Sequence, residues 1–233
     1  MEKPRAVVYL HVEHERSFLL GEALIHVGFA LEERLQGPRP EDANAPLLVV
    51  MGGPMAVYEA SLHPFLQTEL EVLQQRLAAG RPSLGICLGS HLLAAAAGAQ
   101  VHPGEAGAEI GILPVELTLA GQQDAPLSGL AGVPVAHWHS DTFTPVPGAT
   151  LLASTPQYEQ QAFRIGSSYG LQFHPELTAE ALRSWIHVES VELERTGVDA
   201  AALSREAERL VSSQERCEAM LRHLCRQLMS TVR

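Results

Sequence analysis

The feature that most constrains the fold is an alternation of short apolar runs with segments of helical periodicity. Three apolar runs of strand length cover residues 6–12, 47–51 and 83–86. A continuous apolar run such as 47–51 is typical of a strand that is covered on both faces. Strands that alternate with helical segments are typical of βα units around a parallel sheet. The sequence therefore predicts an α/β fold.

Helical spacing occupies the segments between these runs. Leucine and valine recur every three or four residues over 18–35 and over 65–79, which predicts two amphipathic helices. Gly80 follows the second segment, where a C-cap glycine is expected. We predict a further helix over 88–97, directly after the strand that ends at Ile86.

The pattern changes between residues 110 and 173, where proline and glycine separate short apolar runs. This punctuation predicts hairpins or mixed strand pairing rather than further βα units. The five predicted strands cover 112–117, 133–138, 151–154, 162–165 and 170–173.

The C-terminal part is predicted to be helical. A helix over 179–196 is broken by Gly197, and Asp199 is a suitable N-cap for a last helix that runs to about residue 230. Apolar residues recur every seven positions along this last helix, so we expect it to pack on the domain or on a partner subunit. We predict one domain over 1–196, a helical extension over 197–233 and a homodimer as a candidate assembly.

Composition excludes several functional classes. The 233 residues are 46% apolar, which is enough for one substantial core. The net charge is −11, with 27 acidic against 16 basic residues, and no basic footprint for nucleic acid is visible. No apolar run approaches the ~20 residues of a membrane span, and no signal peptide is apparent.

The cysteines fit a reducing compartment, so we expect a cytoplasmic protein. Cys217 and Cys225 are eight residues apart in a predicted helix, or roughly 12 Å, which is too far for a disulfide. The third cysteine, Cys87, lies in a different setting.

Cys87 occupies the corner between a predicted strand and a predicted helix, in the segment Leu-Gly-Ile-Cys-Leu-Gly-Ser-His. This strand–turn–helix arrangement is that of a nucleophile elbow with cysteine in place of serine. We expect Gly85 and Gly89 to let the chain bend and the substrate approach, and the positive end of the helix to favour the thiolate. A buried structural cysteine is the alternative, but its place between two glycines at such a corner favours a nucleophile.

A second group of reactive residue types is Gln-Phe-His-Pro-Glu, where a predicted strand ends near His174. The carboxyl ends of strands are where α/β folds build their sites. An imidazole can hold a thiolate and later protonate a leaving amine near neutral pH, and a carboxylate is needed to orient it. Glu176, two residues on, is placed to do so. We predict that Cys87, His174 and Glu176 act together.

Two glycines follow the buried strand 47–51. Backbone N–H groups of Gly52 and Gly53 can point at a developing oxyanion, and the Leu88 N–H would supply a second donor. An ordinary turn is the alternative for this glycine pair.

Together these segments resemble the class I glutamine amidotransferase family, over most of residues 47–185. The resemblance implies a flavodoxin-like three-layer αβα sandwich with a mostly parallel central sheet and a C-terminal helical extension. It also implies that Cys87, His174 and Glu176 are the catalytic triad, that an oxyanion glycine lies in the Gly-Gly turn, and that no cofactor is needed.

The same resemblance covers residues 137–143, which are similar to the family segment near the α-carboxylate of the substrate. It implies substrate contacts for Ser140, Asp141 and Thr142. One position departs from the family: many members have glutamine four residues after the nucleophile, where this chain has His91. This residue leaves the triad intact and leaves the identity of the amide substrate open.

His137, His139 and Asp141 also have the residue types of a metal site, with the two histidines on one face of a strand. The family resemblance already explains this segment, so we predict no metal.

The chain is similar to stand-alone relatives of the amidotransferase half of GMP synthetase. That similarity implies hydrolysis of glutamine through a cysteine γ-glutamyl thioester, and it makes a separate synthetase subunit, which would receive the ammonia, a candidate partner. Two alternatives stay open at this point. One is a γ-glutamyl peptide hydrolase with the same triad, and the other is a non-catalytic binding or regulatory module.

Overall fold

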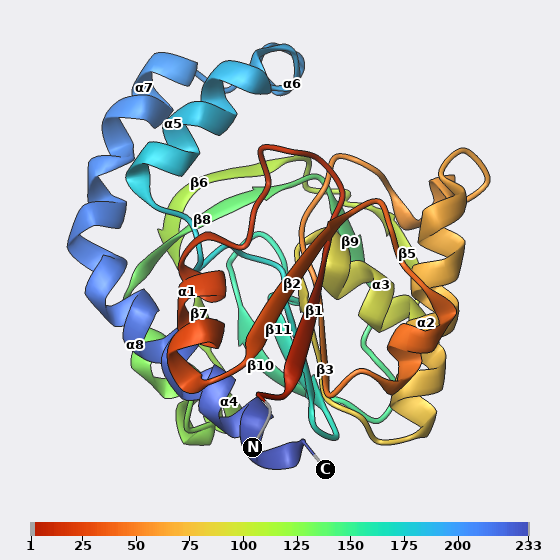
Figure 1. Ribbon diagram of the computed structural model, residues 1–233. Coiled ribbons are helices and arrows are strands. Elements are labelled where there is room, and N and C mark those ends of the chain that lie inside the picture. Colours follow the sequence, from red (N-terminus) through yellow and green to blue (C-terminus); the bar gives the residue numbers. More distant parts are fainter. Residues whose placement is uncertain (1–2, 233) are drawn as a thin grey trace.

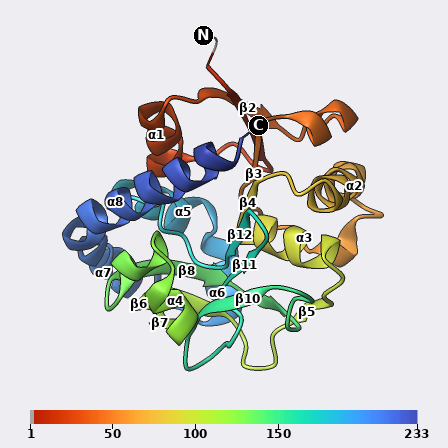
Figure 2. The same ribbon diagram turned by 90° about the horizontal axis from the view of Figure 1, so that it is seen from below.

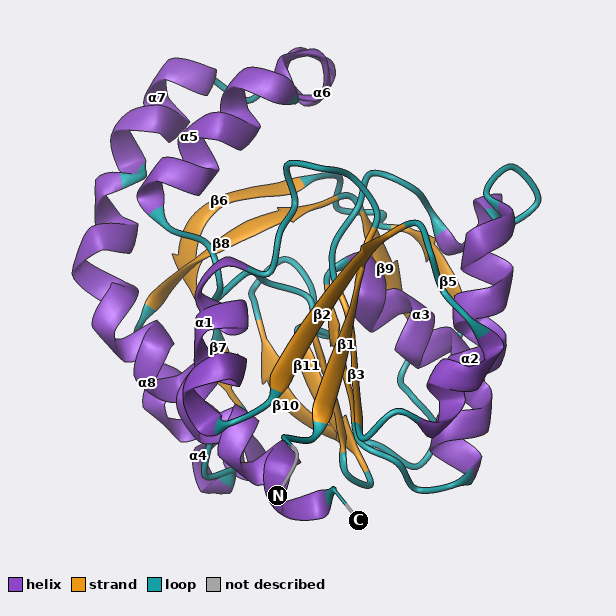
Figure 3. Cartoon of the chain, viewed as in Figure 1, coloured by secondary structure: helices purple, strands orange, loops and turns teal. Residues whose placement is uncertain are grey.

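The computed structural model describes residues 3–232, and within this range an eight-stranded sheet forms the centre of the molecule (Figures 1 and 3). Its strand order is β2-β1-β3-β4-β12-β11-β10-β7. The strands are β1 (Arg5–Leu10), β2 (Ala30–Leu35), β3 (Leu47–Val50), β4 (Ser83–Ile86), β7 (Glu116–Leu117), β10 (Thr150–Ser154), β11 (Ala162–Ile165) and β12 (Ser168–Leu171).

The sheet has a parallel half and an antiparallel half. Strands β2, β1, β3, β4 and β12 pair in parallel, and their order is that of a flavodoxin-like sheet. Strands β12, β11, β10 and β7 pair antiparallel. The predicted α/β fold and the predicted change to hairpins after residue 110 are both confirmed.

Helices cover both faces of the sheet, as the views in Figures 1 and 2 show. Helices α1 (Phe18–Val27) and α8 (Glu208–Thr231) pack on one face, and α2 (Pro64–Ala78) and α3 (Leu88–Ala96) pack on the other. Alternate strand residues divide between two apolar cores because successive side chains of a strand point to opposite faces. The molecule is therefore the predicted three-layer sandwich.

Smaller elements complete the described chain. Two antiparallel ribbons stand outside the main sheet: β6 (Glu109–Pro114) pairs with β8 (Pro134–His139), and β5 (Val101–Pro103) pairs with β9 (Asp141–Phe143). The remaining helices are α4 (Leu119–Gln123), α5 (Ala179–Val188), α6 (Ser190–Thr196), α7 (Ala200–Glu206) and the short 3₁₀ turns Pro40–Asn44, Val57–Glu59 and Leu127–Leu130.

The prediction of one helix over 18–35 is wrong. Helix α1 ends at Val27, and Gly28 follows with φ 114°, a left-handed conformation that caps the helix. Residues Ala30–Leu35 instead form β2, which lies parallel to β1 in residue-by-residue register. The glycine was the available signal, and the leucines at both ends of β2 prolonged the apparent helical pattern.

The predicted C-terminal helices are also divided. Residues 179–196 form α5 and α6, which are separated at Glu189. The predicted last helix is divided near Ala207 into α7 and α8. Asp199 is the N-cap of α7, since its carboxylate accepts hydrogen bonds from the first turn at 2.8 and 3.0 Å. Helix α8 packs against α1 and contributes to the main core. The division of the chain into a domain over 1–196 and an extension over 197–233 stays a prediction. No helix within residues 3–232 is both long and apolar enough to cross a membrane.

Candidate active site

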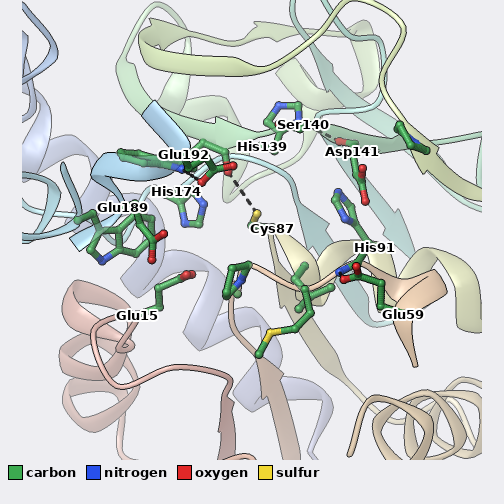
Figure 4. A pocket seen from close by; sticks show the side chains of 18 of the residues that line it. Glu15, Glu59, Cys87, His91, His139, Ser140, Asp141, His174, Glu189 and Glu192 are labelled. Carbon is green, nitrogen blue, oxygen red and sulfur yellow. Dashed lines mark hydrogen bonds between the residues drawn. The ribbon is translucent and has the colours of Figure 1, made fainter. Parts of the chain in front are cut away.

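Polar side chains meet at the carboxyl ends of the parallel strands. His11 follows β1, Gly52 follows β3, Cys87 follows β4 and His174 follows β12. Beside them lies a cavity of about 430 Å³, which is lined by residues from these loops, from the β8–β9 connection and from α5 and α6 (Figure 4). The predicted catalytic segments thus meet at one place, as the topology of such a sheet requires.

Cys87 is held in a strained backbone conformation at the start of α3. Its φ is 50° and its ψ is −111°, a region that non-glycine residues rarely occupy and that costs about 1–3 kcal/mol. The surrounding backbone holds the turn, because the Cys87 N–H donates to the Leu171 carbonyl at 2.8 Å and the Gly89 N–H donates to the Met51 carbonyl at 3.2 Å. The side chain lies in the cavity lining and is 7% exposed.

The two glycines beside Cys87 have a different role from the one predicted. Neither has a positive φ, so chain bending does not explain them. A Cβ at Gly85 would lie 2.2 Å from the carbonyl oxygen of Gly89, and a Cβ at Gly89 would lie 1.9 Å from that of Val50. The glycines therefore let α3 pack directly against β3 and β4, which fixes the position of the Cys87 backbone.

His174 and Glu176 form a buried pair. The Nδ1 atom of His174 lies 2.8 Å from Oε1 of Glu176, and both side chains are 1% exposed. Strand β12 ends at Leu171, so the predicted strand end is too late in the chain. The backbone N–H of His174 is still held, because it donates to the Ala136 carbonyl at 2.8 Å. Trp185 packs edge-on against the imidazole, with 5.0 Å between the ring centres.

The electrostatics of this pair favour a charged imidazole. Burial lowers the pKa of His174, but the nearby Glu176 carboxylate and the Cys87 sulfur outweigh burial and hold it well above its ordinary value. Among the described residues, Nε2 of His174 has no hydrogen-bond partner, and the Cys87 thiol donates instead to the Trp138 carbonyl oxygen at 3.6 Å (Figure 4). Such a ring can hold a thiolate and can give a proton to a leaving group.

The Gly52–Gly53 peptide is oriented by a histidine that sequence reasoning left unassigned. Nδ1 of His11 donates to the Gly52 carbonyl oxygen at 2.6 Å, and Nε2 of the same ring lies 3.0 Å from Glu69. In a trans peptide the C=O and the next N–H point in opposite directions. The bond from His11 therefore turns the Gly53 N–H away from His11, and this N–H has no acceptor within residues 3–232.

His11 bonds two acceptors, a carbonyl and a carboxylate, so both of its ring nitrogens must carry protons. Burial lowers its pKa, but the charge and hydrogen bond of Glu69 outweigh burial and raise it. His11 lies inside the run 6–12 that was predicted as a strand, and only the fold, in which β1 ends at Leu10, places it at the strand end. The residues around Glu69 in the sequence do not indicate that this carboxylate of α2 is buried.

The predicted substrate-contacting residues divide into two groups. The cavity is lined by Gly53, Leu88, His91, Ser140 and Asp141, whereas Gly52 and Thr142 do not line it. Thr142 is instead buried in the β5–β9 ribbon.

His91 is buried beside Phe143, and its Nε2 bonds the side-chain oxygen of Gln172. Burial lowers the pKa of His91 to about 4, so the ring is neutral at pH 7. With Nε2 donating to Gln172, Nδ1 is left as an acceptor.

Four acidic residues that sequence reasoning missed also line the cavity. Glu59 lies on the His91 side of Cys87, and the other three are Glu15, Glu189 and Glu192. We call these three the acidic wall. Figure 4 shows them on the His174 side of Cys87, opposite His91 and Asp141. Glu15 lies in the loop after β1, and the other two lie where α5 gives way to α6. Several other acidic residues surround them in the sequence, so only the folded chain distinguishes them.

The histidines considered for a metal site belong to a buried ionic network. His139 donates to Glu109 at 2.8 Å and to the Asp141 carbonyl at 2.9 Å, which uses both ring nitrogens. His137 lies 3.5 Å from the same carboxylate. Burial favours a raised pKa for Glu109, but the hydrogen bonds from the two histidines hold it well below its ordinary value. Asp141 contributes only its backbone. This donor set fits an ion-pair network that braces β6 against β8.

Comparison with known proteins agrees with this geometry. Residues 20–189 match the family Glutamine amidotransferase class-I. The chain belongs to the class I glutamine amidotransferase family. A crystal structure of a glutamine amidotransferase from Thermotoga maritima superposes with a TM-score of 0.84 at 31% sequence identity, covering 98% of this chain and 99% of that one.

Two curated relatives differ in their named activities. A glutamine-hydrolysing GMP synthase subunit from Methanoregula boonei is 37% identical over 145 residues, which are 60% of this chain and 71% of the relative. A γ-glutamyl-L-1-hydroxyisopropylamide hydrolase from a Pseudomonas species is 31% identical over 141 residues, which are 56% of this chain and 47% of the relative. Both activities act at a γ-glutamyl group, and they differ in the group that leaves.

Proposed function

We propose that this protein is a hydrolase that cleaves the side-chain amide of glutamine through a γ-glutamyl thioester on Cys87. The observation that carries the proposal is the geometry of the elbow. A strained cysteine lies at the end of β4, next to a buried imidazole that a carboxylate holds at 2.8 Å. Family membership supports the same chemistry.

In the first half of the reaction, the Cys87 thiolate attacks the amide carbon and a C–S bond forms. The N–H groups of Gly53 and Leu88 stabilise the negative charge on the carbonyl oxygen. His174 then gives its Nε2 proton to the departing nitrogen, the C–N bond breaks, and ammonia leaves. Glu176 keeps the imidazole oriented and compensates its positive charge throughout.

In the second half, a water molecule attacks the thioester while His174 takes its proton. The C–S bond breaks, Cys87 regains its thiolate, and glutamate leaves. Gly53 and Leu88 again bind the oxyanion. The net reaction consumes one water and converts glutamine into glutamate and ammonia.

The test is ammonia release from glutamine by the purified chain, compared with Cys87→Ala. We expect turnover by the wild type and a loss of at least about 10³-fold in the variant, since the remaining groups can only bind. Turnover retained by Cys87→Ala would contradict the mechanism. Reaction with iodoacetamide separates a silent enzyme from a binding module: rapid alkylation of Cys87 near neutral pH favours an enzyme that lacks an activating partner.

Two questions remain: whether the ammonia passes to a partner protein, and whether a substituted amide rather than glutamine is the substrate. The relative named as a GMP synthase subunit supports a partnership with a separate synthetase subunit, and co-purification of the two chains would test this. The second candidate function is hydrolysis of substituted γ-glutamyl amides. The relative named as a γ-glutamyl amide hydrolase supports it, and so does a cavity whose lining includes Glu189 and Glu192 on the His174 side.

A further inference from the structure

The acidic wall has little unpaired positive charge to balance it, because the charged imidazoles of His174 and His11 are each bonded to a carboxylate of their own, Glu176 and Glu69. Among the described cavity-lining residues, Arg195 is the only arginine or lysine. Its side chain is 68% exposed, and its guanidinium lies 3.6 Å from Glu192. An exposed pair at this distance contributes little. The cavity beside His174 therefore presents excess negative charge to whatever enters it.

Glu15 is the innermost member of the wall. It is 8% exposed, and its carboxylate accepts no hydrogen bond within residues 3–232, since the neighbouring imidazoles of His11 and His174 bond Glu69 and Glu176. One of its oxygens covers Gly52 so closely that a Cβ there would lie 2.5 Å away. Burial raises its pKa to about 7, with Glu189 adding to the rise and His174 opposing it. A buried carboxylate without a donor is a place where a cationic ligand would be stabilised.

The other two members hold their carboxylates at the cavity edge. Glu189 lies 2.9 Å from His14, and Glu192 accepts a hydrogen bond from the Trp138 indole at 2.8 Å. The Trp138 ring meets Trp185 edge-on at 6.1 Å between ring centres. Carboxylates next to indole rings provide the two kinds of group that bind ammonium ions.

The position of the wall relative to His174 decides which part of a substrate it meets. In the proposed reaction His174 protonates the departing nitrogen, so the leaving group must lie on the His174 side of Cys87. The γ-glutamyl part must then lie towards His91 and Asp141, on the opposite side in Figure 4. A leaving amine that carries a chain would extend along this side, where Glu189 and Glu192 line the cavity.

We propose that the acidic wall selects γ-glutamyl amides whose leaving amine carries a second, protonated amino group, that is, γ-glutamyl diamines. This inference rests on the proposed function and deepens it. Cys87 attacks the γ-carbonyl carbon, the C–N bond breaks, and His174 gives its proton to the departing nitrogen while the wall holds the distal ammonium. Water then cleaves the thioester, so the products are glutamate and the free diamine.

The test uses three γ-glutamyl amides that differ in the charge at the far end. They are the amide of 1,4-diaminobutane, that of n-pentylamine, which has a methyl group in place of the ammonium, and that of 4-aminobutanoate, which ends in a carboxylate. We expect kcat/KM for the diamine amide to exceed that for the pentylamide at least about tenfold, as partly buried charge pairs do. The carboxylate should be poorest.

Variants connect the preference to the wall. Glu15→Gln, Glu189→Gln and Glu192→Gln keep the shape and the acceptor oxygen, and each should reduce the diamine-to-pentylamide ratio several-fold. Glu194→Gln is the matched control, since Glu194 lies on α6, is exposed and does not line the cavity. Its ratio should equal that of the wild type. Equal ratios in all four variants would overturn the inference.

Binding to Cys87→Ala makes the inference independent of turnover. Calorimetry with this variant should rank the diamine amide above the pentylamide, and the difference should shrink as salt is added. Hydrolysis of glutamine and of the pentylamide without any preference for the diamine would overturn the inference and leave the proposed function standing. If no compound is hydrolysed, including glutamine, the proposed function fails. The binding order then decides whether the wall recognises a cation.

Discussion

The triad and the acidic wall lie within one cavity, yet they are built in opposite ways. His174 and Glu176 are 1% exposed, paired with each other and anchored to the ends of core strands. Glu189 and Glu192 are 24% and 28% exposed, and they project from a helix junction outside the sheet. The difference indicates that the fold fixes the chemistry, whereas peripheral elements can set substrate preference without disturbing it.

The largest effect is expected at Glu176, because the triad is proposed to act in every turnover, whatever the substrate. Glu176→Gln should reduce kcat about 10³–10⁴-fold, since a neutral amide neither compensates the imidazolium nor fixes its tautomer. Steady-state glutamate release measures this loss. Glu180→Gln, at an exposed position in the first turn of α5, should leave kcat unchanged. A loss of less than about tenfold at Glu176 would contradict the assigned role.

The oxyanion turn should show the next largest effect. A Cβ at Gly53 would lie 2.7 Å from Cβ of His11, so Gly53→Ala must shift the peptide whose N–H is proposed to bind the oxyanion. We expect kcat to fall about 10²-fold. Gly111→Ala is the control, because nothing lies within 4 Å of the added Cβ and its φ is not positive. Similar kinetics for the two variants would remove Gly53 from the mechanism.

The smallest effect is expected in the wall, and it concerns stability rather than chemistry. The pKa of Glu15 is about 7 in the folded protein and about 4.5 when unfolded, so the folded state binds the proton more tightly. Stability should therefore fall as pH rises from about 4.5 to 7. Glu15→Gln should remove this loss and gain about 3 kcal/mol at pH 8, with little change at pH 4. Urea unfolding at both pH values measures it, and an equal change at both would contradict the assignment.

The triad could be predicted from sequence because its residues lie in two short segments with local signals. Cys87 lies between a strand and a helix, and His174 and Glu176 are two residues apart after a strand. Each of these patterns has a physical reason that depends on neighbouring residues alone. The catalytic roles of these residues stay predictions, as do the homodimer and the cytoplasmic location.

The residues that sequence reasoning missed depend on long-range packing. His11 orients the Gly52–Gly53 peptide only because β1 and β3 are adjacent in the sheet, and its charge depends on Glu69 from α2. Glu15 is one of several acidic residues in the first loop, and only the fold buries it against Gly52. Local periodicity also failed at 18–35, where Gly28 ended a helix and pairing with β1 determined the strand that follows.

The central claim, acyl transfer to Cys87, is tested most directly by mass spectrometry of the acid-quenched enzyme during turnover of glutamine or a γ-glutamyl amide. The three cysteines are distinguishable, because Cys217 and Cys225 are buried in α8 and burial raises the pKa of their thiols to about 11 and about 12. We predict one γ-glutamyl group on the peptide that contains Cys87, lost again as substrate is exhausted. Steady turnover with Cys87 unmodified, or with the glutamyl group on another residue, would contradict the claim.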